Sequence, residues 1–232
     1  MKLAFELSGE QKTLPLAEVF GSLAALGIPY MESICSDRIL VIDAQLTQGS
    51  ELLEVQALAL SKRLGLTHSI YSVYCMSRLD EKEILRTVEG VNFNAVMGKD
   101  RTFAVRLRSM STHKSSLGTY SKLKEKESNL LKVVGAIIKR KGYSVNLENP
   151  AKTFVLLLTA ETCFFCLLLH SVDKAHFADN RPHLRPFFSP GVIMPKFARA
   201  IVNLSSVKDN ELFLDPFCGT GGILIEAGMI GA

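Results

Sequence analysis

The sequence predicts an α+β protein over most of its length and the start of an α/β unit at its C-terminal end. Three observations support this. Short apolar strands alternate with helices over residues 1–77, an apolar hairpin and a basic segment follow, and a glycine-rich turn stands between an apolar strand and a helix near the end. With 232 residues, 47% of them hydrophobic and 22% charged, the composition is globular, which excludes a chain that is disordered throughout.

Residues 1–77 form the first predicted unit. Hydrophobic spacing and the stops at Gly27 and Gly65 predict, in order, a strand at 3–7, a helix at 14–26, a strand at 38–42, a helix at 52–64 and a strand at 69–74. The last strand alternates like an edge or half-buried strand, and 31–35 leaves room for one more strand. The resulting βαββαβ order is that of a ferredoxin-like unit.

From Asp80 the predicted order of elements changes. We expect a helix at 81–89, strands near 92–96 and 103–108, a basic polar loop, a helix at 130–141, and an apolar segment at 153–170. That segment is long enough for a short membrane span. Glu161 in its middle would cost a few kcal/mol in hydrocarbon, and each half has the length of a buried strand, so a buried β-hairpin is favoured.

The positive charge of the chain is concentrated in residues 99–141. This segment holds twelve basic and three acidic residues, a net charge of +9, whereas the remainder holds fifteen basic and twenty acidic residues, a net charge of −5. A long basic segment is often only a solvated face, but a partner that carries phosphates is at least as good an explanation. Phe103 and Tyr120 are its only aromatic residues, so recognition of structured RNA through its backbone and shape is favoured over base stacking.

The five cysteines are an odd set without paired metal-ligand spacing, which is typical of a protein in a reducing cytosol. Because Glu6 and Glu10 interrupt the N-terminal segment, no signal peptide is visible there, and we expect a cytoplasmic protein without a metal site. Cys163 and Cys166 lie three residues apart on a predicted strand, so their side chains point to opposite faces and a shared redox or metal role is disfavoured.

Proline is enriched after residue 171, and four prolines lie between Pro182 and Pro195. Each proline removes a hydrogen-bond donor and biases the preceding residue towards extended backbone, so residues 182–195 are expected to lie extended on the surface. We expect no helix or internal strand within 171–195. Pro195 suits the first turn of a helix at 196–204, in which Phe197, Ala200, Ile201 and Leu204 share one apolar face.

The sharpest feature is the segment Glu211–Ala227. A buried strand is predicted to end at Asp215, the chain then turns through three glycines in four residues, and an apolar helix follows. Such a turn brings backbone N–H groups at a helix N-terminus close to a ligand. The Gly-x-Gly-x-x-Gly spacing of dinucleotide-binding proteins is not met, because the residue five positions after Gly219 is Leu224.

At these residues the sequence resembles a known family. DPFCGTGGILIEAG resembles the first S-adenosylmethionine-binding motif of Rossmann-like methyltransferases that modify an exocyclic amine of RNA. The upstream RPHLRPFFSPGVIMPKFARAIVNL resembles the linker and lead-in helix of the archaeal-type tRNA guanine-10 methyltransferases. In those proteins a ferredoxin-like domain and a THUMP domain precede the catalytic domain, and FAVRLRSM and VNLENPAKTFVLLL are similar to the middle region. The resemblance extends over essentially the whole chain.

The resemblance implies four parts: a ferredoxin-like domain at 1–77, a THUMP RNA-binding domain at 78–171, a proline-rich linker at 172–195, and the truncated start of a methyltransferase domain at 196–232. The acidic residue expected to bind the ribose and the Asp-Pro-Pro-Tyr-like motif expected to hold the target amine are not found, so no catalytic residue is assigned in this chain. S-adenosylmethionine is the implied methyl donor, and its binding is assigned to Asp215, Pro216, Phe217, Cys218, Gly219, Thr220, Gly221 and Gly222.

The implied partners are tRNA and, as in some relatives, a small zinc-binding activator subunit, with no membrane. The residues assigned to RNA binding are Arg106, Arg108, Lys114, Lys122, Lys124, Lys139, Arg140, Lys141, Arg181 and Arg185. Two alternatives stay open: a noncatalytic tRNA-binding or adaptor module, and a THUMP protein with other chemistry such as tRNA thiolation. The residues leave open which guanine is modified, and whether it receives one methyl group or two.

Overall fold

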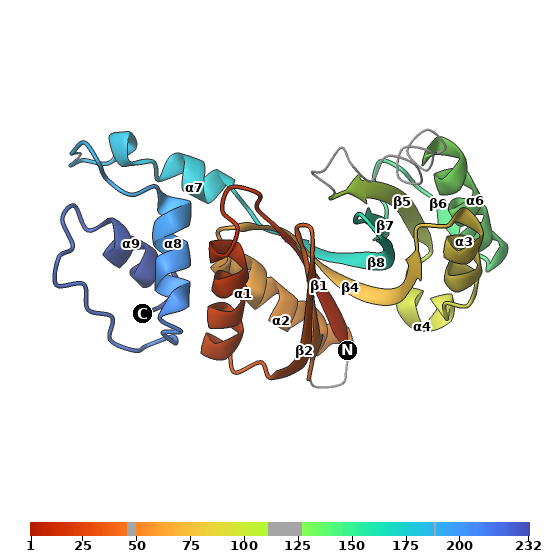
Figure 1. Ribbon diagram of the computed structural model, residues 1–232, viewed down its shortest axis with the longest axis horizontal. Helices are drawn as coiled ribbons and strands as arrows, with labels where there is room; N and C mark the ends of the chain where they lie inside the picture. The colour runs from red at the N-terminus through yellow and green to blue at the C-terminus, as the bar shows by residue number, and fades with distance from the viewer. Residues whose placement is uncertain (46–49, 111–126, 188) are drawn as a thin grey trace. The chain divides into compact units, whose positions relative to one another are not determined.

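The computed structural model describes residues 1–45, 50–110, 127–187 and 189–232 (Figure 1). Within these ranges eight strands hydrogen-bond into one sheet in the order β2-β3-β1-β4-β8-β7-β5-β6. The chain divides into two compact units, each built from several stretches of sequence. One holds Met1–Ala4, Ile34–Val41 and Tyr71–Leu168, and the other holds Phe5–Ser33, Ile42–Ile70 and Leu169–Ala232.

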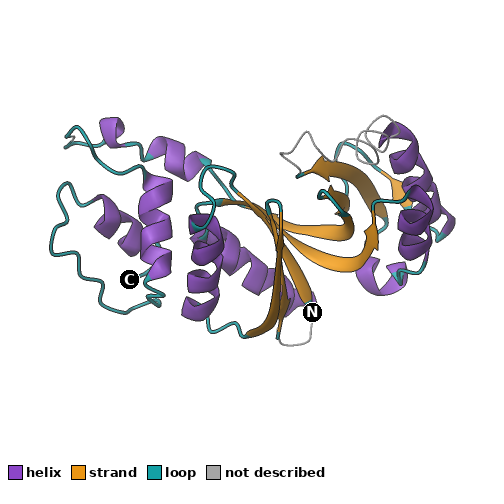
Figure 2. Ribbon diagram, viewed as in Figure 1, coloured by secondary structure: helices purple, strands orange, loops and turns teal. Residues whose placement is uncertain are grey.

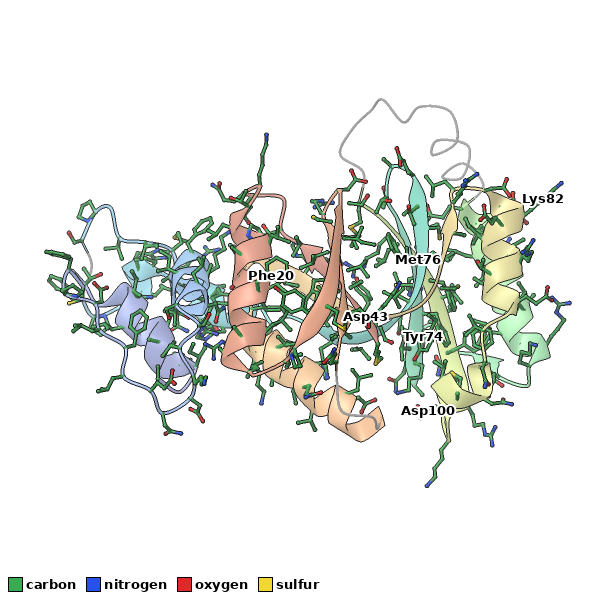
Figure 3. The ribbon with its side chains drawn as sticks, turned by 60° about the horizontal axis from the view of Figure 1, so that its bottom comes forward. Phe20, Asp43, Tyr74, Met76, Lys82 and Asp100 are labelled. Atoms are coloured by element: carbon green, nitrogen blue, oxygen red, sulfur yellow. The ribbon has the colours of Figure 1, made fainter. Side chains whose placement is uncertain are left out.

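The element order predicted for the N-terminal residues is confirmed. The structure has β1 (Lys2–Leu7), α1 (Leu14–Ala25), β2 (Tyr30–Ser36), β3 (Ile39–Ala44), α2 (Ser50–Arg63) and β4 (Thr67–Arg78). Gly27 follows α1 with a φ of +63°, a backbone conformation that favours glycine. Of the two alternatives for the strand at 69–74, the edge strand is excluded, because β4 lies between β1 and β8. Its second half is half-buried, with Tyr74 and Met76 partly exposed (Figure 3).

The elements after β4 are α3 (Glu81–Glu89), α4 (Phe93–Met97), β5 (Thr102–Ser109), α6 (Glu127–Arg140), β6 (Ser144–Val145), β7 (Lys152–Leu158) and β8 (Thr162–Ser171). The strand predicted near 92–96 is wrong, since this segment is α4. The Asn92 side chain accepts a hydrogen bond from the Ala95 backbone N–H at 3.3 Å, so Asn92 caps the helix rather than beginning a strand.

The predicted apolar hairpin is confirmed. Strands β7 and β8 pair antiparallel, with Leu156 opposite Phe165, and β7 also pairs in parallel with β5. Phe164 and Cys166 lie in a buried cluster with Val155 and Leu157. Burial raises the pKa of the Cys163 and Cys166 thiols far above its usual value, so both are packing residues. In the part of the chain that the structure describes, no helix is long and apolar enough to cross a bilayer.

The linker prediction for 171–195 is wrong in part. Helix α7 (Ala175–Asp179) and a 3₁₀ turn (Pro182–Leu184) lie inside it. Helix α7 ends with Asn180 as its C-cap, and Pro182 suits the first position of the next turn, where no backbone donor is needed. Arg181 before Pro182 is extended as expected, with a ψ of 143°. The remaining helices are α8 (Pro195–Leu204), which begins at Pro195 as predicted, and α9 (Gly222–Met229).

Helix α8 packs against both α1 and α9, which lie on either side of it (Figure 1). With two neighbours, the buried surface differs in part from the predicted apolar face: Ala200 is buried as part of that face, but Ile201 and Leu204 are 38% and 44% exposed, and Ala198 and Val202 are buried as well. The approach to α1 is close, since a Cβ added at Gly21 would lie 2.0 Å from the Asn203 carbonyl oxygen.

A buried carboxylate joins α1 to α8. The Glu18 side chain accepts hydrogen bonds from the backbone N–H groups of Gly65 and Leu66 at 2.7 and 2.8 Å, and from Asn203 Nδ2 at 3.0 Å. Asn203 Nδ2 also donates to the Arg63 carbonyl oxygen at 2.9 Å. Burial raises the pKa of Glu18, and these hydrogen bonds oppose that rise. The result is a polar link between the N-terminal helices and the lead-in to the glycine-rich turn.

This packing predicts the effect of adding one methyl group at each of two helical glycines. Gly21→Ala would push the backbones of α1 and α8 apart at Asn203 and should lower the free energy of unfolding by about 1–3 kcal/mol. Gly135→Ala in α6 is the matched control, because a Cβ there meets nothing within 4 Å and alanine gains about 0.5–1 kcal/mol of helix propensity. Urea unfolding of both variants measures the difference. Equal stabilities would show that α1 and α8 do not pack this closely.

Candidate functional site

The glycine-rich turn is held by local hydrogen bonds. Asp215 Oδ1 accepts from the Phe217 N–H at 3.1 Å, and the Gly221 N–H donates to the Cys218 carbonyl at 2.8 Å. Gly219 and Gly221 have φ values of +53° and +74°, and Gly221 immediately precedes α9. A Cβ at either glycine would meet nothing within 4 Å, so glycine is required there by backbone conformation and not by packing.

The strand predicted at 211–215 is wrong. These residues are loop, and a long segment without regular structure joins α8 to α9 (Figure 2). Leu212 and Leu214 are exposed, as is Phe217 in the turn, and Ile223, Leu224 and Ile225 of α9 are at least partly exposed. A strand needs a neighbour for its backbone hydrogen bonds, and the sheet formed by the described residues offers none to this segment.

A buried ion pair joins α8 to α9, the helix that follows the glycine-rich turn. Glu226, one helical turn after Gly222, places Oε2 at 2.8 Å from Arg199 Nη2 of α8, with the two side chains 0% and 3% exposed. Arg199 Nη1 donates to the Lys62 carbonyl at 2.9 Å, and its guanidinium lies over the Phe177 ring. His176 Nε2 lies 3.4 Å from Glu226 Oε2. These contacts connect α7, α8 and α9 and the C-terminal end of α2.

These polar residues were not assigned from the sequence. Glu226 interrupts the apolar run Ile-Leu-Ile-Glu-Ala, and Arg199 lies within Phe-Ala-Arg-Ala-Ile-Val, so a charged residue inside an apolar helix was the available signal. Their pairing joins positions far apart in sequence, and no local pattern reports it. Glu18 of α1 and Asn203 of α8 were missed for the same reason.

Arg185 lies beside the glycine-rich turn. A Cβ at Gly222 would lie 3.3 Å from Arg185 Nη1, so this glycine makes room for the guanidinium. Arg185 Nε donates to the Asn180 carbonyl at 3.1 Å, whereas its buried Nη atoms have no hydrogen-bond partner among the described residues. The turn therefore offers backbone N–H groups together with a cation, a combination suited to an anionic group.

Described residues of the basic segment line a cavity between β5, α6 and β6. It has a volume of about 740 Å³, with mainly apolar walls, three cationic side chains, Arg106, Lys132 and Lys139, and one carboxylate, Glu127. Arg106 Nη2 donates to the Leu147 carbonyl at 2.6 Å, which fixes the guanidinium at this cavity. Arg106 and Lys139, which were both assigned to RNA binding from the sequence, thus line one cavity.

The other residues assigned to RNA binding are less concentrated. Arg140 is exposed and lies 3.5 Å from Glu89, Lys141 follows α6, and Arg108 lies exposed on β5. Arg181 lies in a separate cavity with two lysines. Three assigned residues fall outside the described ranges, namely Lys114, Lys122 and Lys124.

Comparison with known proteins adds sequence relatives. The tRNA (guanine(10)-N2)-dimethyltransferase of Methanothermobacter thermautotrophicus is 35% identical over 232 residues, which is all of this chain and 62% of that protein. The enzyme of the same name from Methanocaldococcus jannaschii is 50% identical over 102 residues, 44% of this chain and 29% of that protein. The chain therefore spans less than two thirds of the length of these relatives.

Two solved structures share the fold. TrmN from Thermus thermophilus is similar over 100% of this chain and 63% of its own, with 21% identity and a TM-score of 0.58. SMU.472, solved as a complex with SAH, is similar over 99% of this chain and 55% of its own, with 19% identity and a TM-score of 0.53.

A family model matches the part of the chain that carries the glycine-rich turn. The match covers residues 182–232 and is to the RMKL-like methyltransferase domain. It begins at Pro182, inside the segment predicted as a linker, and includes Arg185, all of α8 and all of α9. Residues 182–232 are thus similar to an RMKL-like methyltransferase domain.

Proposed function

We propose that this chain is the tRNA-binding front half of an enzyme that transfers a methyl group from S-adenosylmethionine to the exocyclic amine of a tRNA guanine, at position 10. The observation that most strongly supports this proposal is the glycine-rich turn at a helix N-terminus, inside a segment that matches a methyltransferase domain. A relative named for methylation of guanine 10 is 35% identical over the whole chain, which supports the substrate.

We propose S-adenosylmethionine as the cofactor, bound in part by Asp215–Gly222. The turn presents backbone N–H groups at the start of α9, and Arg185 adds a cation beside Gly222; both suit the carboxylate of an amino-acid moiety. The related SMU.472 structure was solved with SAH, which supports the same class of ligand. Guanine's exocyclic amine is a weak nucleophile, so rate depends on positioning it in line with the sulfonium methyl group.

We propose that the front of the chain binds tRNA through two domains. Residues 1–77 would be a ferredoxin-like domain, supported by the order β2-β3-β1-β4 of its strands. Residues 78–171 would be a THUMP domain, 172–195 a linker and 196–232 the start of the methyltransferase domain. The cationic cavity with Arg106 and Lys139 supports RNA binding by the second of these domains. A zinc-binding activator subunit stays a proposal from the resemblance alone.

Charge reversal on α6 tests the RNA-binding proposal. Lys139→Glu, Arg140→Glu and Lys141→Glu together should weaken tRNA binding by about a hundredfold at low salt and flatten its dependence on log salt concentration, because several phosphate contacts are lost. Lys2→Glu, Lys12→Glu and Lys208→Glu together are the control of equal charge. Filter binding at several salt concentrations measures both quantities. Equal loss in the two triple variants would assign the effect to net charge and remove α6 from the binding surface.

A chimera tests the catalytic proposal. This chain, completed with the part of the Methanothermobacter relative that the match does not cover, should transfer radiolabelled methyl groups from S-adenosylmethionine to guanine 10 of unmodified tRNA. Asp215→Ala in the chimera should lower kcat/KM about tenfold or more, because the carboxylate holds the turn through the Phe217 N–H. Asp179→Ala, an exposed carboxylate on α7, is the matched control.

Residues 1–232 alone should show no turnover and only weak cofactor binding, since one turn contacts only one part of the cofactor. Primer extension locates the modified guanine. A folded, tRNA-binding chimera without methylation would favour the adaptor alternative, and turnover by residues 1–232 alone would contradict the assignment of catalytic groups outside them.

A further inference from the structure

A second cationic cavity lies at the beginning of α8, outside both sites described above. It has a volume of about 290 Å³, and its lining includes Lys174, which follows β8, Arg181, which precedes the 3₁₀ turn, and Lys196 in the first turn of α8. Glu10 is the carboxylate on its lining. All four residues belong to one compact unit.

The cavity carries more positive than negative charge. Glu10 pairs with Lys196, with its two carboxylate oxygens 2.5 and 2.7 Å from Lys196 Nζ. This pair leaves two cations. Arg181 forms no ion pair with a carboxylate in the described ranges. Lys174 Nζ contacts His68 Nδ1, and no carboxylate of the described residues lies within ion-pair distance of Lys174. Three cationic side chains therefore line a cavity whose one lining carboxylate, Glu10, forms an ion pair with only one of them, Lys196.

Burial and neighbouring charges both act on Lys174 in this cavity. Burial is the main cause that lowers the pKa of Lys174, and the nearby Lys196 lowers it further, against the opposing effect of Glu10 and Glu6. An anion placed between these groups would offset the desolvation of Lys174 and its repulsion by Lys196. The first turn of α8 adds a partial positive charge on the same side, because Met194, Pro195 and Lys196 line the cavity.

We propose that this cavity binds one phosphate group, supplied by the backbone of the RNA substrate. A phosphodiester presents two charged oxygens, which a guanidinium fork and a lysine ammonium can bind from different sides, and Lys174, Arg181 and Lys196 supply this set of donors. The RNA source rests on the proposed function, whereas the phosphate chemistry rests on the cavity alone. Of these three residues, sequence reasoning assigned only Arg181 to RNA, and neither lysine.

A double-mutant cycle in tRNA binding tests the site. Lys174→Gln and Arg181→Gln should each weaken tRNA binding several-fold, and the double variant should bind about tenfold more weakly than the wild type. The loss of binding free energy in the double variant should be smaller than the sum of the two single losses, because both groups hold one phosphate. The slope of log affinity against log salt should fall by about one in the double variant. Lys2→Gln with Lys208→Gln is the control of equal charge, and Arg181→Lys should restore part of the affinity.

A second measurement separates the RNA backbone from free phosphate as the source. Inorganic phosphate at constant ionic strength should raise the melting temperature of the wild type but not of the double variant, relative to chloride. Loss of this shift with unchanged tRNA binding would assign the cavity to free phosphate. An unchanged salt slope together with equal phosphate stabilisation of both proteins would overturn the proposal. Phosphate stabilisation of a wild type that binds no tRNA would instead contradict the proposed function and leave the phosphate site intact.

Discussion

The ion pair between Arg199 and Glu226 is the interaction on which the position of the glycine-rich turn depends. Both side chains are buried, and α9 is only eight residues long, so this pair acts together with the small apolar cluster of Val202, Ala227 and Ile223 to hold the helix against α8. Arg199 also binds the Lys62 carbonyl and packs over Phe177, which extends the link to α2 and α7. Removing one partner of a buried pair leaves the other charge uncompensated, at a cost of about 3–5 kcal/mol.

Helix α8 carries this link to the N-terminal helices. The close approach at Gly21 and the hydrogen bonds from Asn203 to Glu18 and Arg63 hold α8 against α1 and the end of α2. The glycine-rich turn and the N-terminal helices consequently belong to one packed unit. The phosphate site proposed at the start of α8 and the glycine-rich turn would then keep a constant separation, because both belong to this unit.

Local patterns were sufficient for most elements, and the exceptions have physical causes. The N-terminal element order, the hairpin and the start of α8 at Pro195 follow from periodicity, glycine stops and proline chemistry within a few residues. Residues 92–97 were misread because Asn92 acts as a helix cap, a role that depends on where its side chain folds back. The strand expected at 211–215 needs a neighbouring strand, which lies outside any local pattern.

The site was predictable to the same extent. The turn at 215–222 followed from its motif, and the assignment of Arg106 and Lys139 followed from charge, because glycine spacing and basic clustering are visible in the sequence. That these two side chains line one cavity was not visible there. The face that α8 buries, and the partners Arg199 and Glu226, were not predictable, since each depends on which helices meet. When a buried polar pair joins distant segments, the only sign of it in the sequence is a single charged residue within an apolar run.

Hydrogen exchange of residues 1–232 with and without unmodified tRNA tests the central claim most directly, namely that the front of the chain binds RNA and the turn does not. Mass spectrometry of peptic peptides should show slower exchange on RNA binding in 101–110, 127–141 and 172–196, and unchanged exchange in 212–221. Protection confined to 212–232, or no protection at saturating tRNA, would contradict this account.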